Sequence, residues 1–466
     1  MIAELKPYEE YKTSGQSWLG DIPQHWTLSR LGARLYERRE TNDQNQVQDV
    51  LSVMKTRGVI PYAEKGNVGN KRSEDIRRYK IVRPDDIVLN CMNVIIGSLG
   101  ISKYTGCLSP VYYVLRTRMD DDLPRYFTAV FQNPRFHKSL VRIGNGILAH
   151  RMRIPMEKLK CEMIPVPPPD EQALIVRFLD WASVRLGKAI AAKRKVIGLL
   201  EEQKQAIIHR AVTRGLDENV KRNCEHAPWL GELPSNWPVF RAKLLFHQVR
   251  PEMPENAQQV TCFRDGQVTL RSNRRTTGFT NAIWELGYQG IYPGQLVLHS
   301  MDAFAGAIGV SDSTGKCSPE YVICEPSMDG ISSDYYALLL RSLAVRGFFV
   351  MLCPSVRQRA PRVRYNDFGS FILPKPSESE QREIVGYVKN ALKEIESSIL
   401  KNRRSIELLI ECRTRLVADV VTGKLDVREF ARSLPDDVSE EVAELAATEA
   451  LDEDFATDDE MIEEAV

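Results

Sequence analysis

The chain has 466 residues, of which 43% are hydrophobic and 27% are charged, a length that suits about three globular domains. Its nine cysteines include no C-x-x-C pair, and the chain begins with no cleavable signal. No apolar run approaches the ~18 residues of a membrane span. A disulfide framework, a transmembrane helix and secretion are therefore not predicted, and a cytoplasmic location is expected.

The formal net charge of +1 conceals a separation of charge along the chain. Residues 433–466 hold 14 Asp or Glu and no Lys or Arg, so 63 basic residues face 48 of the 62 acidic ones elsewhere. A body with this balance of +15 is typical of a protein that binds nucleic acid. The acidic tail is predicted to be disordered or loosely helical, with a solubilising role favoured over a regulatory one.

A short phrase rich in tryptophan opens each half of the chain. The phrase W-L-G-D-I-P-Q-H-W begins at Trp18, and W-L-G-E-L-P-S-N-W begins at Trp229. Two Trp residues that bracket a Gly and a Pro predict a packed turn anchored by the rings. An exposed recognition role for the rings is the less favoured alternative.

Short β-branched runs bounded by Gly, Pro or Asp follow each opening and predict strands. The predicted strands are 49–53, 86–89 and 111–116 in the first half and 259–263, 295–298 and 321–324 in the second. Helical segments are predicted at 124–140 and 333–351. The globular part of each half is therefore expected to be α+β, with a curved or barrel-like sheet.

A proline-rich segment then precedes a long helix in each half. The prolines hold the chain extended, and Asp170 and Ser377 can cap the helices that follow. The helices are predicted from about 170 to 213 and from about 379 to 422, each stopped by a Gly, Gly215 or Gly423. At 1.5 Å per residue, each helix is about 65 Å long.

Both helices keep an apolar heptad seam, which predicts that they pair as an antiparallel coiled coil. The positions that mark this pairing are Leu186, Lys193, Leu200, Ile395, Asn402 and Leu409. A two-fold relation between the halves brings the midpoints of the helices together. Lys193 and Asn402, the polar seam residues at these midpoints, are therefore predicted to lie close to each other.

The second half is a diverged copy of the first at an offset of 209 residues. Residues 86–116 and 295–325 are identical at 11 of 31 positions. Within them Gly97 and Gly100 recur as Gly306 and Gly309, where a turn or a close backbone approach requires Gly. The same offset relates the long helices, so the repeated unit is a globular domain with its helix. Two diverged copies predict two similar surfaces for an asymmetric, two-part target.

Three duplicated motifs together resemble the specificity subunit of a Type I restriction-modification system. They are the paired W-L-G-x-[IL]-P-x-x-W openings, the two [IL]-P-x-P…E-Q helix starts, and the two T-x-x-L-D endings that begin at Thr213 and Thr422. The resemblance covers about residues 5–430, and the acidic tail lies outside it.

The resemblance implies two target-recognition domains and two long antiparallel helices. Each domain of such a subunit reads one half of an asymmetric DNA sequence, and the helices fix the spacer between the halves. The helices also dock two methyltransferase (modification) subunits, and a restriction/translocase subunit can join the complex. The specificity subunit is itself not a catalyst and needs no cofactor.

The expected organisation is α+β, with two strand-rich recognition domains and an internal pseudo-two-fold repeat. The first recognition domain is predicted over residues 1–169 and the second over 215–378. The long helices are predicted over 170–214 and 379–426, and the acidic tail over 433–466.

An enzyme with its own chemistry is the main alternative. Residues 133–136 read N-P-R-F, similar to the N-P-P-[FY] box of amino-methyltransferases, but they sit in a helical stretch and no glycine-rich cofactor loop precedes them. There is no P-loop sequence, and Cys224 with His226 lacks the second ligand pair of a zinc finger. An orphan DNA adenine methyltransferase and a coiled-coil scaffold without a DNA role are both less favoured than a DNA-reading subunit.

Base reading needs side chains such as Arg and Lys in loops where the two copies differ. Three pairs of loops meet that criterion: 55–57 against 264–265, 67–72 against 271–275, and 146–153 against 356–362. The candidate DNA-binding residues are Lys55, Arg57, Lys71, Arg72, Arg151, Arg153, Arg264, Arg271, Arg274, Arg275, Arg357 and Arg362. Arg153 and Arg362 are equivalent in the repeat, and a shared Arg suits a phosphate or a structural carboxylate better than differing bases. A solvated surface is the plain alternative for each loop.

Overall fold

The computed structural model describes residues 5–54, 57–65, 71–92, 97–145, 152–223, 230–274, 286–349 and 362–434. These residues fall into two compact units. Of the described chain, the first unit holds everything up to residue 194 and from 404 onward, and the second holds 195–403. Each unit therefore combines one strand-rich domain with one part of each long helix.

The first unit contains an antiparallel four-stranded sheet in the order β4-β11-β8-β9. These strands are Leu35–Glu37, Tyr112–Thr117, Ile87–Asn90 and Leu99–Ile101. Four strand pairs accompany the sheet: β1 (Tyr11–Thr13) with β2 (Asp21–Pro23), β3 (Thr27–Arg30) with β12 (Met163–Val166), β5 (Leu51–Met54) with β6 (Gly58–Pro61), and β7 (Lys80–Val82) with β10 (Gly106–Leu108).

The second unit contains a four-stranded sheet with the corresponding order, β16-β23-β20-β21. Its strands are Phe246–Val249, Tyr321–Pro326, Leu296–His299 and Ile308–Val310. The accompanying pairs are β13 (Arg222–Asn223) with β14 (Leu233–Pro234), β15 (Val239–Arg241) with β24 (Ile372–Pro374), β17 (Val260–Cys262) with β18 (Val268–Leu270), and β19 (Gln289–Ile291) with β22 (Gly315–Cys317). All six strands predicted from the sequence are present in the two units, shifted by at most two residues.

The central strands of both sheets are buried on both faces. In β8, Ile87 and Leu89 belong to the main core of the first unit, whereas Val88 packs into a separate core with the β5–β6 hairpin. In β20, Leu296 and Leu298 face the main core of the second unit and Val297 faces the β17–β18 hairpin. Because successive side chains of a strand point to opposite faces, these continuous apolar runs place each sheet between its helices and its hairpin.

The short helices are α1 (Leu31–Arg34), α2 (Pro124–Phe131), α3 (Pro134–Leu140), α4 (Met156–Leu159), α6 (Ala242–Leu245), α7 (Ser333–Val345), α9 (Tyr365–Ser370) and α11 (Arg428–Arg432). Of these short helices, α2, α3 and α7 lie in the segments predicted to be helical, and the others were not predicted. Short 3₁₀ turns are η2 (Tyr62–Lys65), η4 (Val141–Ile143), η7 (Arg271–Asn273) and η8 (Ala303–Ala305).

The single helical segment predicted at 124–140 is wrong in one respect, because the chain breaks between α2 and α3. Asn133 is extended (φ −70°, ψ 117°), and its side chain accepts a hydrogen bond from the backbone N–H of Arg135. Pro134 cannot donate to a preceding turn, so the sequence Asn-Pro ends one helix and caps the next.

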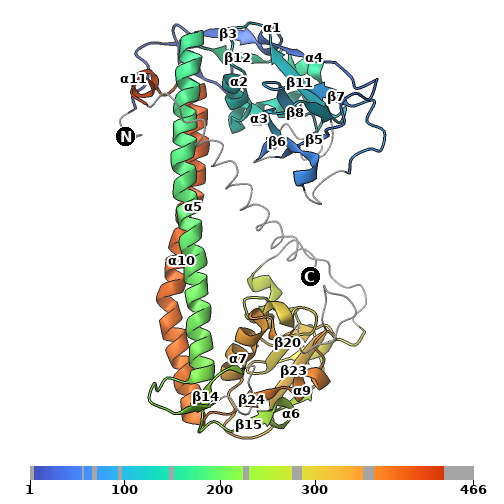
Figure 1. The fold of residues 1–466 in the computed structure, drawn as a ribbon, viewed down its shortest axis with the longest axis vertical. Coiled ribbons are helices and arrows are strands. Elements are labelled where there is room, and N and C mark those ends of the chain that lie inside the picture. Colours follow the sequence, from blue (N-terminus) through green and yellow to red (C-terminus); the bar gives the residue numbers. More distant parts are fainter. Residues whose placement is uncertain are drawn as a thin grey trace. The chain divides into compact units, whose positions relative to one another are not determined.

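The two predicted long helices are present as α5 (Pro169–Arg214) and α10 (Glu378–Val421), drawn in green and orange in Figure 1. Each is followed by a glycine in the left-handed region, Gly215 (φ 69°) and Gly423 (φ 73°). Only glycine adopts that conformation without strain, which explains why both helices stop there.

The glutamine of each E-Q motif ties the start of its helix to the domain before it. Gln172 accepts from the backbone N–H of Leu123 at 3.0 Å and donates to the carbonyl of Pro167 at 3.1 Å. Gln381 accepts from Ser332 at 2.9 Å and donates to Pro376 at 2.9 Å. Both glutamines are fully buried, so each helix start has a fixed position relative to its domain.

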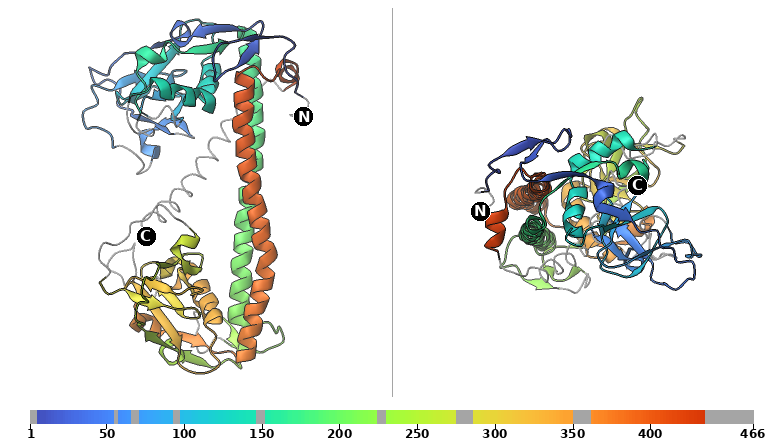
Figure 2. Two further views of the ribbon diagram at one scale, coloured as in Figure 1. Left: turned by 180° about the vertical axis from the view of Figure 1, so that it is seen from behind. Right: turned by 90° about the horizontal axis from the view of Figure 1, so that it is seen from above.

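Within each unit, α5 and α10 lie side by side and run in opposite directions (Figure 2). In the first unit, Ile175 and Leu179 of α5 share a core with Val420 near the end of α10. In the second, Lys204 pairs with Glu396 at 2.5 Å and Glu201 with Arg403 at 3.1 Å, so residue numbers rise along one helix as they fall along the other.

The heptad seam holds only in part. Leu186 and Ile395 are buried, Leu200 and Leu409 are partly buried, and Lys193 and Asn402 are partly exposed. Further along the α5 seam, Val196 and Gln203 are exposed, and Ile197 and Ile208 pack into the core instead. A straight helix drifts by about 20° per heptad against a strict 3.5-residue repeat, and this drift rotates the seam out of contact.

The tryptophans of the opening phrases act as core anchors, as predicted for Trp18, Trp26 and Trp237. All three are buried, and Trp18 packs on Phe136 with ring centroids 4.9 Å apart. Trp229 lies outside the described residues. The predicted α+β class, with two strand-rich domains and two long helices, is confirmed.

Candidate nucleic-acid interface

The β5–β6 hairpin carries Arg57 in the first unit. The hairpin presses against β9 through glycines, since a Cβ on Gly100 would lie only 2.7 Å from the Cα of Gly58. The guanidinium of Arg57 donates to the carbonyl of Glu64 at 3.0 Å and to its carboxylate at 3.1 Å. This hairpin places Arg57 next to the start of β9.

Lys71 and Arg72 follow the same hairpin and are exposed. The backbone N–H of Arg72 donates to the hydroxyl of Tyr62 at 2.9 Å, and Tyr62 starts the 3₁₀ turn that also holds Glu64. The first two loops predicted for this half are therefore joined through that turn.

Arg153 is exposed at the other end of the β8–β9 connection. It pairs with Asn145 through two backbone hydrogen bonds of 2.8 and 3.0 Å, and Ile154 donates to the carbonyl of Cys91 just after β8. Burial raises the pKa of the Cys91 thiol, and the charge of Arg153 acts against that rise. The third loop thus emerges next to the end of β8.

In the second unit, Arg264 and Asp265 form the turn of the β17–β18 hairpin. The turn rests on two glycines, one in β21 and one just after η8. A Cβ on Gly309 would collide with the carbonyl of Gly266, and one on Gly306 would lie 2.8 Å from that of Arg264. The guanidinium of Arg264 donates to Asp302 at 2.8 Å. Arg264 therefore lies against the β20–β21 connection; at the 209-residue offset its counterpart is Lys55, which lies outside the described residues.

The side chain of Arg274 contacts the same hairpin turn. Its guanidinium donates to Asp265 at 2.6 Å and lies over the ring of Phe263, with Cζ 4.2 Å from the centroid. Arg271 instead donates to Thr261 at 3.1 Å, at the base of the hairpin. The first two loops of this half are thus brought together at Arg264 and Arg274.

Arg362, at the end of the third loop, lies near the same strand connection. Its guanidinium lies 3.5 Å from Glu320 and 3.9 Å from the sulfur of Met301, and Val363 donates to the carbonyl of Ser300. The third loop therefore returns to the β20–β21 connection, as Arg153 does in the first unit. In each unit several of the described candidates lie near the same edge of the sheet: Arg57 and Arg153 in the first unit, and Arg264, Arg274 and Arg362 in the second.

Four predicted residues, Lys55, Arg151, Arg275 and Arg357, lie outside the described residues, as do Cys224 and His226. Within the described ranges, no group of three or more His, Cys, Asp or Glu could hold a metal ion. Within the same ranges, no helix has the length and apolarity needed to cross a membrane.

The N-P-R-F segment has a structural role. Asn133 is fully buried as the N-cap of α3, and Phe136 is fully buried against Trp18 and Phe131. Neither side chain can grip a base in these positions.

The carboxylates that hold the arginines were not predicted from the sequence. Asp302 was among the positions where the copies differ, since its counterpart in the repeat is Asn93. A single sequence has no pattern that predicts which carboxylate will face an arginine across a strand connection. The contact depends on the hairpin folding back over the sheet.

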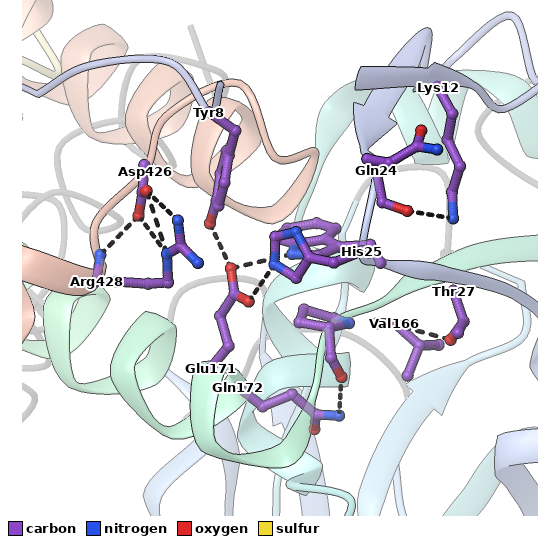
Figure 3. A network of polar contacts seen from close by, with 12 residues as sticks. Tyr8, Lys12, Gln24, His25, Thr27, Val166, Glu171, Gln172, Asp426 and Arg428 are labelled. Atoms are coloured by element: carbon purple, nitrogen blue, oxygen red, sulfur yellow. Dashed lines mark hydrogen bonds and ion pairs between the residues drawn. The ribbon is translucent and has the colours of Figure 1, made fainter. Parts of the chain in front are cut away.

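A buried carboxylate also organises the opening of the first unit (Figure 3). Glu171 accepts from the hydroxyl of Tyr8 at 2.6 Å and from Nε1 of Trp26 at 3.0 Å, and Nε2 of His25 lies 2.7 Å away. Burial and the contact with Glu171 raise the pKa of Tyr8. Arg428 stacks on the Tyr8 ring at 4.9 Å, so the network links the N-terminal segment, the start of α5 and the chain after α10.

Comparisons with known proteins agree with this arrangement. The chain is 21% identical over 459 residues to the putative type I restriction enzyme MjaX specificity subunit of Methanocaldococcus jannaschii, covering 92% of this chain and 100% of that protein. No family model matches the chain.

A chain from a solved structure, "Structural basis underlying complex assembly and conformational transition of the type I R-M system", superposes with a TM-score of 0.63 at 14% identity, covering 87% of this chain and 99% of that one. The HsdS subunit from Thermoanaerobacter tengcongensis matches at 15% identity over 87% of this chain and 98% of that one, with a TM-score of 0.44. The resemblance seen in the motifs is thereby confirmed: over nearly its full length the chain is similar in sequence to a type I specificity subunit, and it has the fold of a chain from a type I restriction-modification structure.

Proposed function

We propose that this chain is the DNA sequence-reading subunit of a type I restriction-modification complex. The observation that carries the proposal is the repeated edge: two sheets with the same strand order each gather arginines around the connection after the central strand. The scaffold is common to both units, and the side chains on it differ. The two edges are the recognition surfaces, and each reads one half of an asymmetric duplex in the cytoplasm.

Arginine suits this task because its guanidinium donates to phosphates and makes bidentate contacts with guanine. The two equivalent arginines, Arg153 and Arg362, contact phosphates, which are the same in every sequence. The arginines that differ between the units, Arg57 on one side and Arg264 with Arg274 on the other, read the different half-sites.

The chain does not carry out catalysis, which belongs to its partners. The long helices set the spacer between the half-sites and dock two methyltransferase subunits, and a restriction/translocase subunit completes the assembly. Leu199 on α5 and Leu408 on α10 support two docking sites. They are equivalent in the repeat, and both are exposed, by 55% and 49%. A large apolar side chain left exposed at the same position of each copy fits two identical partners.

A mobility-shift assay with and without purified methyltransferase subunits tests the proposal. We expect the assembled complex to bind one duplex with two separate sequence elements and to lose affinity steeply with salt. A chain that binds the partner subunits but leaves them without any sequence preference would instead be a scaffold. S-adenosylmethionine binding by the isolated chain would identify it as an orphan methyltransferase.

A further inference from the structure

The arginines at the two edges are held by carboxylates of different burial. Arg57 pairs with Glu64, whose side chain is 51% exposed, Arg274 with Asp265 at 52%, and Arg362 with Glu320 at 38%. Arg264 pairs with Asp302, whose side chain is only 13% exposed. Exposed ion pairs are weak and leave their side chains free to move. Among these four carboxylates Asp302 is the most buried, so it holds its arginine in place before a ligand arrives.

Asp302 is itself fixed from several sides. Nδ1 of His299 lies 3.2 Å from its carboxylate, and the His299 ring packs edge-on against Tyr321 with centroids 4.7 Å apart. Burial opposes ionisation of Asp302, but the contacts of its carboxylate with His299 and Arg264 outweigh burial, and the pKa of Asp302 lies below its ordinary value. The carboxylate is therefore charged at neutral pH.

The backbone of Arg264 is fixed as well. The turn closes with hydrogen bonds from Phe263 to Gln267 at 2.8 Å and from Gly266 to Phe263 at 2.9 Å. The carbonyl of Arg264 lies against Gly306 (φ 96°), and a side chain at Gly306 would collide with that carbonyl. Arg264 thus has a fixed backbone as well as a fixed guanidinium.

The pairing also changes what Arg264 can bind. Among the described residues, Nη2 is the only guanidinium atom of Arg264 with a hydrogen-bond partner, which leaves donors on Nε and Nη1. The positive charge, however, is balanced by Asp302. A neutralised arginine gains little from a phosphate, whose attraction is mainly electrostatic. It remains a full donor to a base edge, and a fixed guanidinium loses less entropy on forming two parallel hydrogen bonds.

We propose that Arg264 reads a guanine in the second half-site and that Asp302 is the residue that positions it. This assignment rests on the proposed function and specifies it. In the repeat, the counterparts of Arg264 and Asp302 are Lys55 and Asn93, so the first copy has no carboxylate at the position of Asp302. Arg362 is more exposed than Arg264 and lies farther from its carboxylate, so we assign it to the phosphate backbone of the DNA instead.

The test uses the assembled complex with its methyltransferase subunits and a target found by sequencing methylated adenines. Affinity is measured by fluorescence anisotropy for that duplex and for duplexes with each base pair changed in turn. Arg264→Ala is expected to weaken the cognate duplex about ten- to a hundredfold, to abolish discrimination at one G·C pair of one half-site, and to leave the salt slope nearly unchanged. Arg362→Ala, the matched control, is expected to weaken all duplexes alike and to lower the salt slope by about one.

Asp302→Asn keeps a hydrogen-bond partner for Arg264 and removes the charge. It is expected to reduce discrimination at the same base pair severalfold while the melting temperature of the complex stays close to that of the wild type. A purely structural role for Asp302 would lower the melting temperature and leave discrimination intact, which overturns the assignment. So does an Arg264→Ala variant that weakens every duplex equally. If the wild-type complex shows no sequence preference at all, the proposed function itself fails.

Discussion

The two strand-rich domains share their frame and differ at their surfaces. Gln172 and Gln381 make the same buried hydrogen bonds at the two helix starts. Tyr126 donates to the carbonyl of Pro165 at 3.0 Å, and Tyr336, one residue beyond the counterpart of Tyr126 in the repeat, donates to the equivalent carbonyl of Pro374 at 2.9 Å. The arginines at the two edges, by contrast, pair with carboxylates from different places in the chain.

This difference separates the residues that hold the fold from the residues at the exposed edges. Groups that fix the backbone are the same in both copies because both domains need one sheet and one helix in one geometry. On the proposed function, groups at the edge diverge because they meet different bases. That function predicts a two-part target with unlike halves.

The tryptophan-rich segments that open the two halves also differ in their hydrogen bonds. Removing the carboxylate of the first segment's network has the largest expected effect on stability. Glu171 accepts hydrogen bonds from Tyr8 and Trp26, whereas among the described residues Nε1 of the equivalent Trp237 is buried without a partner. We expect Glu171→Ala to destabilise the first unit by about 3 kcal/mol, since it leaves several buried donors unpaired.

Glu380→Ala is the matched control for Glu171→Ala. Among the described residues the carboxylate of Glu380 accepts no hydrogen bond, so a loss within about 1 kcal/mol is expected. Thermal and urea unfolding of the full chain measure both variants. Equal losses for the two would show that the network around Glu171 contributes nothing special to the first unit.

The exposed leucines on the long helices test whether the two copies dock partners alike. Leu199→Glu and Leu408→Glu are each expected to weaken the binding of one methyltransferase subunit by about 2 kcal/mol, so that this subunit is lost from the complex. The reason is that a charge replaces an apolar side chain that the bound subunit would bury. Mass determination of the complex counts the subunits, and the double variant should bind none. Retention of both subunits by each single variant contradicts two equivalent docking sites.

The arginines that differ between the copies should act on one half-site each. Arg274→Ala is expected to weaken binding of the cognate duplex by about 1 kcal/mol, through the second half-site only, and Arg57→Ala through the first only. Anisotropy titrations on duplexes with one half-site scrambled separate the two effects. Unchanged affinity and an unchanged salt slope for Arg274→Ala would remove that loop from the interface.

The last prediction concerns acid stability, which should differ between the units. Burial, together with the charges of Arg346 and Arg214, lowers the pKa of His209 from its ordinary value of 6.5 to about 4. Between these values the unfolded chain binds a proton that the folded chain excludes, so stability falls as the pH drops from 6.5 toward 4. The equivalent residue in the first unit is Ala418.

His209→Gln should remove part of this pH dependence from the second unit. Melting temperatures recorded across that pH range, with and without the substitution, measure the change. A variant with the same slope as the wild type would exclude His209 as the source.

Much of the fold could be predicted from local patterns. Gly215 and Gly423 mark the ends of the helices, and the β-branched runs mark the strands, because these features depend on the backbone alone. The break at Asn133 was missed because an amphipathic pattern continues across it. The outward turn of Val196 was missed because a heptad read along a sequence ignores the accumulated drift of a straight helix.

The site could be predicted only in outline. Comparing the copies identified the loops that carry Arg57, Arg264 and Arg274, since divergence within a shared frame is visible in one sequence. It could not identify Asp302 as the partner of Arg264, because that contact joins a hairpin turn to a strand connection 38 positions away. The close proximity of Lys193 and Asn402 stays a prediction.

The most direct test of a two-part DNA reader is to sequence methylated adenines in cells that express the methyltransferase subunits, with and without this chain. We expect methylation only when the chain is present, at a two-part sequence with unlike halves and a fixed spacer. Arg264→Ala should then relax one position of one half and leave the other half unchanged. Methylation at a palindromic or continuous sequence, or methylation that does not depend on this chain, would contradict the proposed function.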